Sequence, residues 1–197
     1  EHLQQINKIA SALKIKALVC MDIDLSTRLP GTHFGVYRSA INSTNKAEQF
    51  IKFLLGCKYL KLCGVMGYEA QIAGLGNNFK GQRFKNWLVQ YFQKKSMQEV
   101  VDRRTKLAEL TEKMVGKLDF VNGGGTGSVE QTVRESKVTE VTVGSGFYTP
   151  TLFDNYKHFQ HMPSAAYAIE IVRQPKQDIY TCMGGGYVAS GALGADK

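Results

Sequence analysis

The sequence predicts an α/β fold in which parallel strands are joined by crossover helices, followed by a short antiparallel β unit. Three observations predict it. Four apolar runs, at residues 17–24, 59–68, 118–123 and 140–143, alternate with helical segments. Glycines and polar residues follow the runs, and parallel α/β folds place their sites at the carboxyl ends of strands. After Pro163, two strand-like runs follow each other without an intervening helix.

The first half of the chain is expected to form two helices and two strands. The chain opens in a helix, because Leu3, Ile6, Ile9, Ala10 and Leu13 lie at helical spacing. Residues 17–24 form a near-continuous apolar run, which is typical of a buried parallel strand. Pro30 and Gly31 then break the chain. Residues 45–55 are expected to be a helix, and residues 59–68 the next strand.

The second half continues this alternation and then departs from it. A long helical region at 84–117 leads into the strand that begins at Leu118, and a short helix at 129–136 leads into the last parallel strand. Residues 166–173 and 179–183 are expected to be strands. The polar link between them contains Pro175 and is too short for a helix, so these strands should pair antiparallel.

Composition limits the function. The 197 residues are 43% hydrophobic, which is ample for a packed core. The net charge of +8 suits anionic ligands but is too diffuse to establish nucleic-acid binding. No signal peptide or long apolar span indicates secretion or a membrane. The chain starts without Met, inside a helix, and is expected to be an excerpt of a longer protein.

The cysteines indicate a reducing compartment. Cys20, Cys57, Cys63 and Cys182 form no CxxC pair, and three of them lie in apolar runs. Reduced, buried thiols of a cytoplasmic protein are therefore expected.

The strongest functional signal is a pair of glycine-rich loops, each of which follows a strand. The first contains Gly123, Gly124, Gly125, Thr126 and Gly127, and the second contains Gly144, Ser145 and Gly146. Glycine lets backbone N–H groups approach an anion closely, and a following helix adds free N–H groups and a positive dipole end. A βα barrel builds its phosphate pocket from its last two loops. The alternative is two tight turns whose glycines only relieve strain.

Five stretches, in the same order, resemble the D-serine dehydratase and D-threonine aldolase family of the alanine racemase-like, fold type III pyridoxal phosphate enzymes. They are residues 21–28, 64–69, 121–128, 143–154 and 184–191. The resemblance implies the C-terminal half of a (β/α)8 TIM-like barrel followed by the start of an antiparallel β domain. Residues 1–164 would belong to the cofactor-binding barrel, and residues 165–197 would begin the β domain.

The resemblance also implies a pyridoxal-phosphate-dependent lyase acting on a D-amino acid, by D-serine dehydration and deamination or by D-threonine aldol cleavage. Amino acid racemisation is a related alternative. A homodimer is implied, and a divalent metal bound by some members would lie beyond Lys197. The family's Schiff-base lysine ends the first barrel strand, and its motif is absent here. Lys14 and Lys16 precede a strand, so the catalytic lysine is expected outside this chain.

By resemblance, the glycine loops would hold the cofactor phosphate, Arg28 would face its phenolic oxygen, and Tyr68 would lie against its pyridine ring. Arg28 could instead be a surface residue paired with Asp22 or Asp24, and Tyr68 could be core packing. Thr142 occupies the place where alanine racemases carry an arginine opposite the pyridine nitrogen.

Two further patterns favour structural roles. His33, His158 and His161 lack an accompanying carboxylate or cysteine cluster, so no metal site is predicted. The basic segment 80–106 carries Phe84, Trp87, Leu88 and Tyr91 at helical spacing, which predicts a barrel-covering helix with a solvated basic face, and no nucleic-acid site. Two other functions stay open: a non-catalytic pyridoxal phosphate carrier, and a phosphosugar or flavin barrel enzyme.

Overall fold

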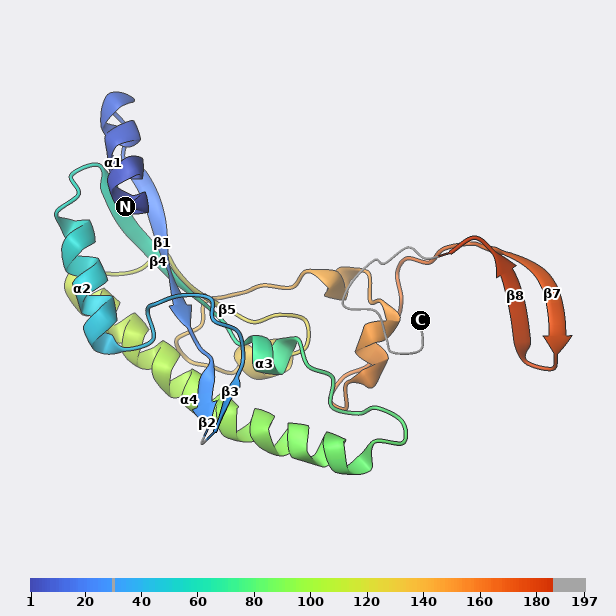
Figure 1. Ribbon diagram of the computed structural model, residues 1–197. Coiled ribbons are helices and arrows are strands. Elements are labelled where there is room, and N and C mark those ends of the chain that lie inside the picture. The colour runs from blue at the N-terminus through green and yellow to red at the C-terminus, as the bar shows by residue number, and fades with distance from the viewer. Residues whose placement is uncertain (30, 186–197) are drawn as a thin grey trace.

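A four-stranded parallel sheet organises the computed structural model, which describes residues 1–29 and 31–185 (Figure 1). The strands are β1 (Ala17–Asp24), β4 (Leu60–Tyr68), β5 (Phe120–Gly123) and β6 (Glu140–Val141), paired in that order. Each strand lies beside the next one along the sequence, as in a section of a βα barrel. The predicted order of parallel strands is confirmed.

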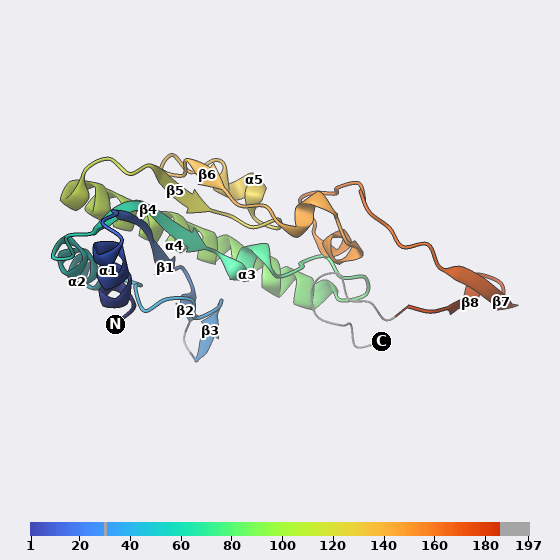
Figure 2. The ribbon, with the colours of Figure 1, turned by 90° about the horizontal axis from the view of Figure 1, so that it is seen from above.

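Helices pack on one face of this sheet. They are α1 (His2–Ala12), α2 (Thr44–Leu55), α3 (Ala70–Ala73), α4 (Arg83–Val115) and α5 (Val129–Thr132). Figure 2 shows α4 running along the strands. The core lies where α2 and α4 meet the sheet, and it includes Ile23, Ile51, Leu54, Val65 and Leu107, each at most 2% exposed.

The opposite face of the sheet is more open than the sequence predicted. The continuous apolar run of β1 indicated burial on both faces, but Leu18 is 62% exposed and Cys20 is also exposed. Their neighbours Met21 and Ile23 are fully buried. Side chains of a strand point alternately to opposite faces. Because α2 and α4 cover one face only, the β1 side chains that point the other way remain accessible.

A hairpin that the sequence did not predict follows β1. Strands β2 (Thr27–Leu29) and β3 (Thr32–Phe34) pair antiparallel, with Arg28 opposite His33. Gly31 has a φ of +74°, a left-handed conformation that favours glycine. The predicted chain break at this position is therefore a reversal into a hairpin. Two 3₁₀ helices, η1 (Ser145–Phe147) and η2 (Thr151–Asn155), also had no counterpart in the predicted elements.

The last described strands form an antiparallel hairpin, as predicted. They are β7 (Glu170–Lys176) and β8 (Ile179–Met183). The first strand lies later than predicted and includes Pro175, which a two-stranded hairpin tolerates because one edge needs no N–H donor. Figures 1 and 2 show this hairpin apart from the sheet. The proposed boundary at residues 164/165 stays a prediction, and residues 186–191 of the third glycine motif lie outside the described residues.

The prediction that an aromatic face of α4 covers the barrel is wrong. Phe84, Trp87 and Tyr91 are 75%, 59% and 53% exposed. Helix α4 has 33 residues and is therefore about 50 Å long, whereas the nine-residue β4 spans about 30 Å. The C-terminal part of α4 packs on the sheet through Val100 and Leu107. Its first turns extend past the strands, so their aromatic side chains have no sheet beneath them.

Within residues 1–29 and 31–185, no helix is both long and apolar enough to cross a membrane.

Two neighbouring leucines in α2 test where the core lies. Leu54 is 2% exposed and belongs to the core, whereas Leu55 is 56% exposed. We expect Leu54→Ala to lower the free energy of unfolding by about 2–5 kcal/mol, because it leaves a cavity. Leu55→Ala should change it by no more than about 0.5 kcal/mol. Urea unfolding measures both, and equal effects would contradict the packing of α2 described above.

Candidate functional site

The two glycine-rich loops meet at the carboxyl edge of the sheet. Residues 123–127 leave β5, and residues 144–146 follow β6 and enter η1. The backbone N–H of Gly146 donates a hydrogen bond to the hydroxyl of Thr126 over 2.9 Å. Neighbouring parallel strands place these loops side by side. The structure therefore brings together the two loops predicted to hold a phosphate.

Close packing explains several of the glycines in these loops, Gly125 and Gly127 among them. A Cβ added at Gly125 would lie 2.7 Å from the Tyr68 ring, and one at Gly127 would lie 2.4 Å from the carbonyl oxygen of Ala73. Tyr156 donates a hydrogen bond to the same carbonyl over 2.9 Å. At these two positions glycine is required by contact with the protein itself. By contrast, a Cβ added at Gly144 would meet nothing within 4 Å.

Several donors in the loops face no protein acceptor. Across the described part of the chain, the backbone N–H groups of Thr126, Gly127 and Ser145 make no hydrogen bond. Such groups need a partner, which an anion or water can supply. The helix predicted to add a dipole at this point is short: α5 contains four residues and ends at Thr132. The predicted helix at 129–136 is therefore shorter than expected, and its dipole adds little to the free backbone N–H groups.

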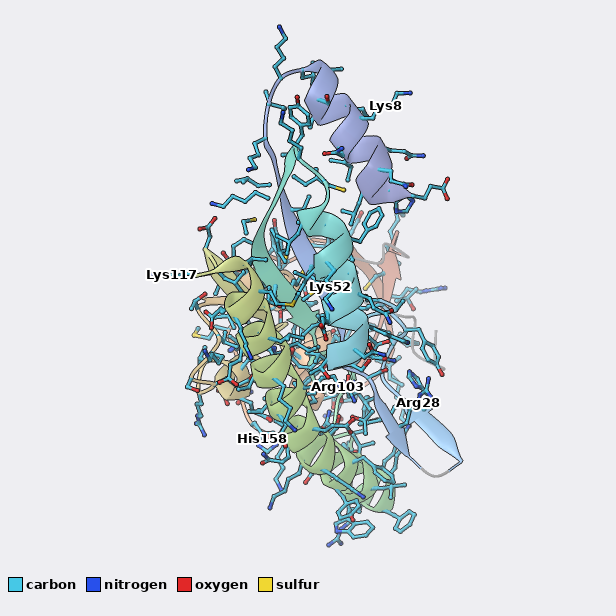
Figure 3. The ribbon with its side chains drawn as sticks, turned by 90° about the vertical axis from the view of Figure 1, so that its left-hand side faces the viewer. Lys8, Arg28, Lys52, Arg103, Lys117 and His158 are labelled. Carbon is cyan, nitrogen blue, oxygen red and sulfur yellow. The ribbon has the colours of Figure 1, made fainter. Side chains whose placement is uncertain are left out.

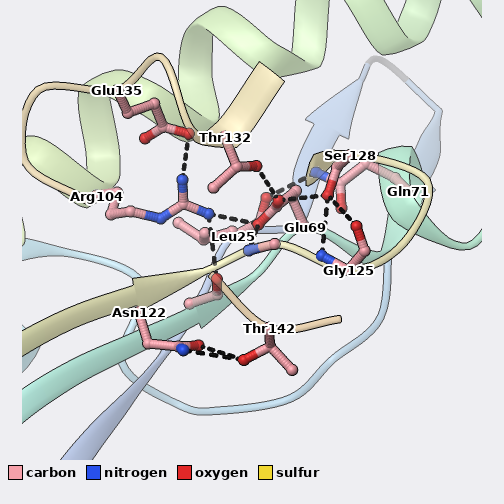
Figure 4. A network of polar contacts seen from close by, with 12 residues as sticks. Leu25, Glu69, Gln71, Arg104, Asn122, Gly125, Ser128, Thr132, Glu135 and Thr142 are labelled. Atoms are coloured by element: carbon pink, nitrogen blue, oxygen red, sulfur yellow. Dashed lines mark hydrogen bonds and ion pairs between the residues drawn. The ribbon is translucent and has the colours of Figure 1, made fainter. Parts of the chain in front are cut away.

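A buried ionic network lies beneath the first loop (Figure 4). Arg104, from α4, is fully buried and pairs with both Glu69 and Glu135. Its guanidinium also donates to the carbonyl oxygen of Gly67 over 3.1 Å. A Cβ added at Gly123 would lie 2.8 Å from the Arg104 guanidinium carbon, so glycine makes room for this side chain.

Glu69 connects the network to the loop. It follows β4 directly and is fully buried. One carboxylate oxygen accepts the backbone N–H of Gly124 over 3.3 Å, and the other accepts the hydroxyls of Ser128 and Thr132, each over 2.6 Å. The Ser128 hydroxyl in turn accepts the backbone N–H of Gly125 over 3.1 Å. Glu69 thus bonds directly to Gly124 at the start of the loop and to Ser128 just after its end, and Ser128 bonds to Gly125.

Neither Arg104 nor Glu69 is among the site residues predicted from the sequence. The prediction of a solvated basic face on α4 is wrong for Arg104, which is fully buried. A usable signal existed, because Arg104 shares helical spacing with the buried Val100, Leu107 and Thr111. Glu69 lay within a stretch that carries the family resemblance, but no sequence pattern indicated its partners.

Arg28 and Tyr68 lie in different surroundings. Arg28, labelled in Figure 3, is exposed on β2 and lines a cavity of about 280 Å³. The other residues lining this cavity are Asp24, Ser26, Tyr37, Asn42, Glu99 and Arg103. Among the residues described, no contact joins Arg28 to Tyr68 or to the glycine loops. The role of Arg28 stays a prediction.

A second arginine lies at Tyr68 instead. The Arg38 guanidinium stands over the Tyr68 ring, 5.4 Å from its centroid, and pairs with Asp22 over 3.2 Å. Asp24 accepts the backbone N–H of Ser26 over 2.7 Å. The surface pairing considered for Arg28 is thus not formed with Asp22. Burial raises the pKa of Tyr68, and the charge of Glu69 adds to this effect.

Thr142 is held by Asn122 on the neighbouring strand. The Asn122 amide donates to the Thr142 hydroxyl over 2.9 Å and to the Glu140 carboxylate over 2.7 Å. This position therefore presents a hydrogen-bonded hydroxyl at the carboxyl edge of the sheet (Figure 4).

The remaining histidines and cysteines form no cluster. The His33 ring stacks on Tyr37 with centroids 3.7 Å apart, and His158 is exposed. Within the described ranges, no group of three His, Cys, Asp or Glu side chains could hold a metal ion. All four thiols are free. Cys57 and Cys63 are buried as predicted, but Cys20 is exposed because it points to the open face of the sheet.

Comparisons with known proteins support the fold. No family model matches the chain, and no curated protein matches it. A crystal structure of D-threonine aldolase from Filomicrobium marinum is 12% identical, with a TM-score of 0.63 over 88% of this chain and 42% of that chain. A D-threo-3-hydroxyaspartate dehydratase is 15% identical, with a TM-score of 0.56 over 78% of this chain and 35% of that chain.

An alanine racemase from Streptomyces coelicolor A3(2) is 13% identical, with a TM-score of 0.52 over 75% of this chain and 32% of that chain. This chain has the alanine racemase-like fold. It spans less than half the length of each of these structures. The predicted fold, the C-terminal part of the barrel, is confirmed.

Two alanine substitutions separate a packed glycine from an open one. Gly127→Ala should lower the free energy of unfolding by about 1–3 kcal/mol, because its methyl group would overlap the Ala73 carbonyl. Gly144→Ala should change it by less than about 0.5 kcal/mol, because the added methyl meets open space. Urea unfolding of both variants measures the difference, and a tolerated Gly127→Ala would contradict this loop geometry.

Glu135 should leave a signature in the pH dependence of stability. Burial raises its pKa above the ordinary value of 4.5, although the Arg104 guanidinium opposes the shift. The folded state then keeps a proton that the unfolded state has lost, so this carboxyl reduces stability as pH rises above 4.5, until it ionises in the folded state.

Glu135→Gln removes that titration. The stability of this variant relative to the natural sequence should therefore rise with pH from about pH 4 and level off above the folded-state pKa. Urea unfolding across this range measures the difference, with Glu112→Gln as the partly exposed control. A difference that stays flat or falls with pH would contradict the assignment.

Proposed function

We propose that this chain forms the phosphate-binding part of a pyridoxal-phosphate-dependent enzyme that acts on a D-amino acid. The observation that carries the proposal is the junction of two glycine-rich loops, through Gly146 and Thr126, at the carboxyl edge of an alanine racemase-like sheet. Backbone donors without acceptors among the described residues lie in these loops, as an anion site requires.

The residues have distinct proposed roles. The loops containing Gly123, Gly124, Gly125, Thr126 and Gly127, and Gly144, Ser145 and Gly146, enclose the cofactor phosphate. Tyr68, packed against Gly125, offers an aromatic face to the pyridine ring. Arg28 is proposed to reach the phenolic oxygen, as the family resemblance implies. The bound cofactor would act as an electron sink for bonds to the substrate Cα, while the chain holds and orients it.

We propose a lyase reaction on a β-hydroxy D-amino acid. The names of two similar structures, a D-threonine aldolase and a D-threo-3-hydroxyaspartate dehydratase, support this class. The name of the alanine racemase keeps racemisation as the second candidate. The products separate the three reactions: a keto acid with ammonia, an aldehyde with a smaller amino acid, or the L-enantiomer. Cofactor binding without any turnover would favour a carrier.

The first experiment is a visible absorbance spectrum of the natural protein that contains this chain. We expect a band that borohydride removes, leaving a pyridoxyl group on a lysine outside these 197 residues. Peptide mass mapping locates the group, and Lys14 and Lys16 should be unmodified. A colourless protein that cannot be reconstituted with pyridoxal phosphate would overturn the proposal and favour a phosphosugar or flavin ligand.

Two further features belong to the proposal. We propose a cytoplasmic homodimer, which light scattering and cell fractionation test. A divalent metal would be held outside this chain, and chelation followed by an activity assay with added metal tests that dependence.

A further inference from the structure

We propose that Glu69 and Arg104 are positioning residues that determine which backbone N–H groups of the 123–127 loop face a bound phosphate. The inference rests on the proposed function, because it concerns the same phosphate. Neither side chain touches the ligand in this arrangement. Their effect is transmitted through the backbone and hydroxyl groups that Glu69 binds.

The contacts of Glu69 divide the donors of the loop into two groups. The N–H of Gly124 points to the Glu69 carboxylate, and the N–H of Gly125 points to the Ser128 hydroxyl, which Glu69 also binds. These two donors are satisfied inside the protein. The next two N–H groups along the chain, those of Thr126 and Gly127, have no acceptor among the described residues. The phosphate should therefore bind at Thr126 and Gly127.

Arg104 makes this arrangement possible. A carboxylate removed from water is costly unless it is paired and hydrogen-bonded, and a lone one beneath an anion site would also repel the anion. The Arg104 guanidinium contacts Glu69 directly, and neither side chain is exposed. Glu69 can therefore act as an acceptor for the loop without presenting an unpaired charge beneath a phosphate.

This bonding gives the loop a fixed conformation before the ligand arrives. Glycine-rich segments lose much conformational entropy when they become ordered. Here Glu69 bonds to Gly124 at the start of the loop, and to Ser128 and Thr132 after its end. Because the loop is already ordered in the folded protein, phosphate binding costs little further conformational entropy, and this increases the affinity for the phosphate.

The test compares pyridoxal 5′-phosphate with pyridoxal, which lacks the phosphate. The natural protein that contains this chain should bind the phosphorylated form more tightly. Glu69→Asp keeps the formal charge but shortens the side chain, so it weakens the bonds to the loop without removing the carboxylate. We expect it to reduce the ratio of the two dissociation constants about tenfold or more, and to leave pyridoxal binding nearly unchanged.

Glu112→Asp is the matched control. Glu112 lies on the same helix as Arg104, and its carboxylate pairs with Lys137 over 2.9 Å in a partly exposed position. This substitution should leave the ratio unchanged. Ser128→Ala is the second variant, which keeps the test valid if Glu69→Asp does not fold. It removes the acceptor of the Gly125 N–H and should reduce the ratio severalfold.

The outcomes separate the two proposals. A natural protein that does not prefer the phosphorylated form overturns the proposed phosphate site, whatever the variants do. If it has that preference and folded variants keep it, the proposed function stands and the positioning role is wrong. Equal weakening of both ligands also overturns the positioning role, because it indicates a general loss of structure.

Discussion

The buried ion pairs of Arg104 are the interaction on which the rest of this structure depends. One guanidinium joins three segments that are distant in sequence: the end of β4 through Glu69, the segment after α5 through Glu135, and helix α4 itself. Removal of the Arg104 guanidinium would leave two carboxylates uncompensated in a dry site, which is strongly destabilising. The relative positions of helix, sheet and loop are therefore coupled at this point.

The ion pairs of Arg104 also explain why the two interpretations of the loop glycines, as tight packing turns and as a phosphate site, are compatible. Gly123 leaves room for the Arg104 guanidinium, and Gly125 and Gly127 leave room for Tyr68 and Ala73. These are packing requirements, as the simpler alternative proposed. Yet the packing directs the loop so that the Gly124 N–H binds Glu69 and the Gly125 N–H binds Ser128. The N–H groups of Thr126 and Gly127 find no acceptor among the described residues. Tight turns and the proposed anion site thus follow from one arrangement.

Local sequence patterns predicted the helices and strands whose formation depends mainly on residues close in sequence. The apolar runs of β1 and β4, the periodicity of α2 and the antiparallel pairing of β7 with β8 follow from spacing and chain breaks. The helical spacing of Arg104 with Val100 and Leu107 indicated its buried position, but its two carboxylate partners could not be predicted in this way, because they are distant in sequence. The exposure of Trp87 could not be predicted from local patterns either, because it depends on the length of α4 relative to the strands. Boundaries of short elements such as α5 depend on tertiary bonds from Glu69.

Because the sequence identity to the similar structures is low, only some features of this chain can support a proposal of function. At 12–15% identity the fold is retained while most side chains differ. The fold alone hosts several reactions, so it cannot select one. The glycine loops are different, because their main-chain donors are set by conformation and need no particular side chain to bind a phosphate. For the proposed phosphate site, the important residues are therefore those that fix this conformation, and in this structure they centre on Glu69.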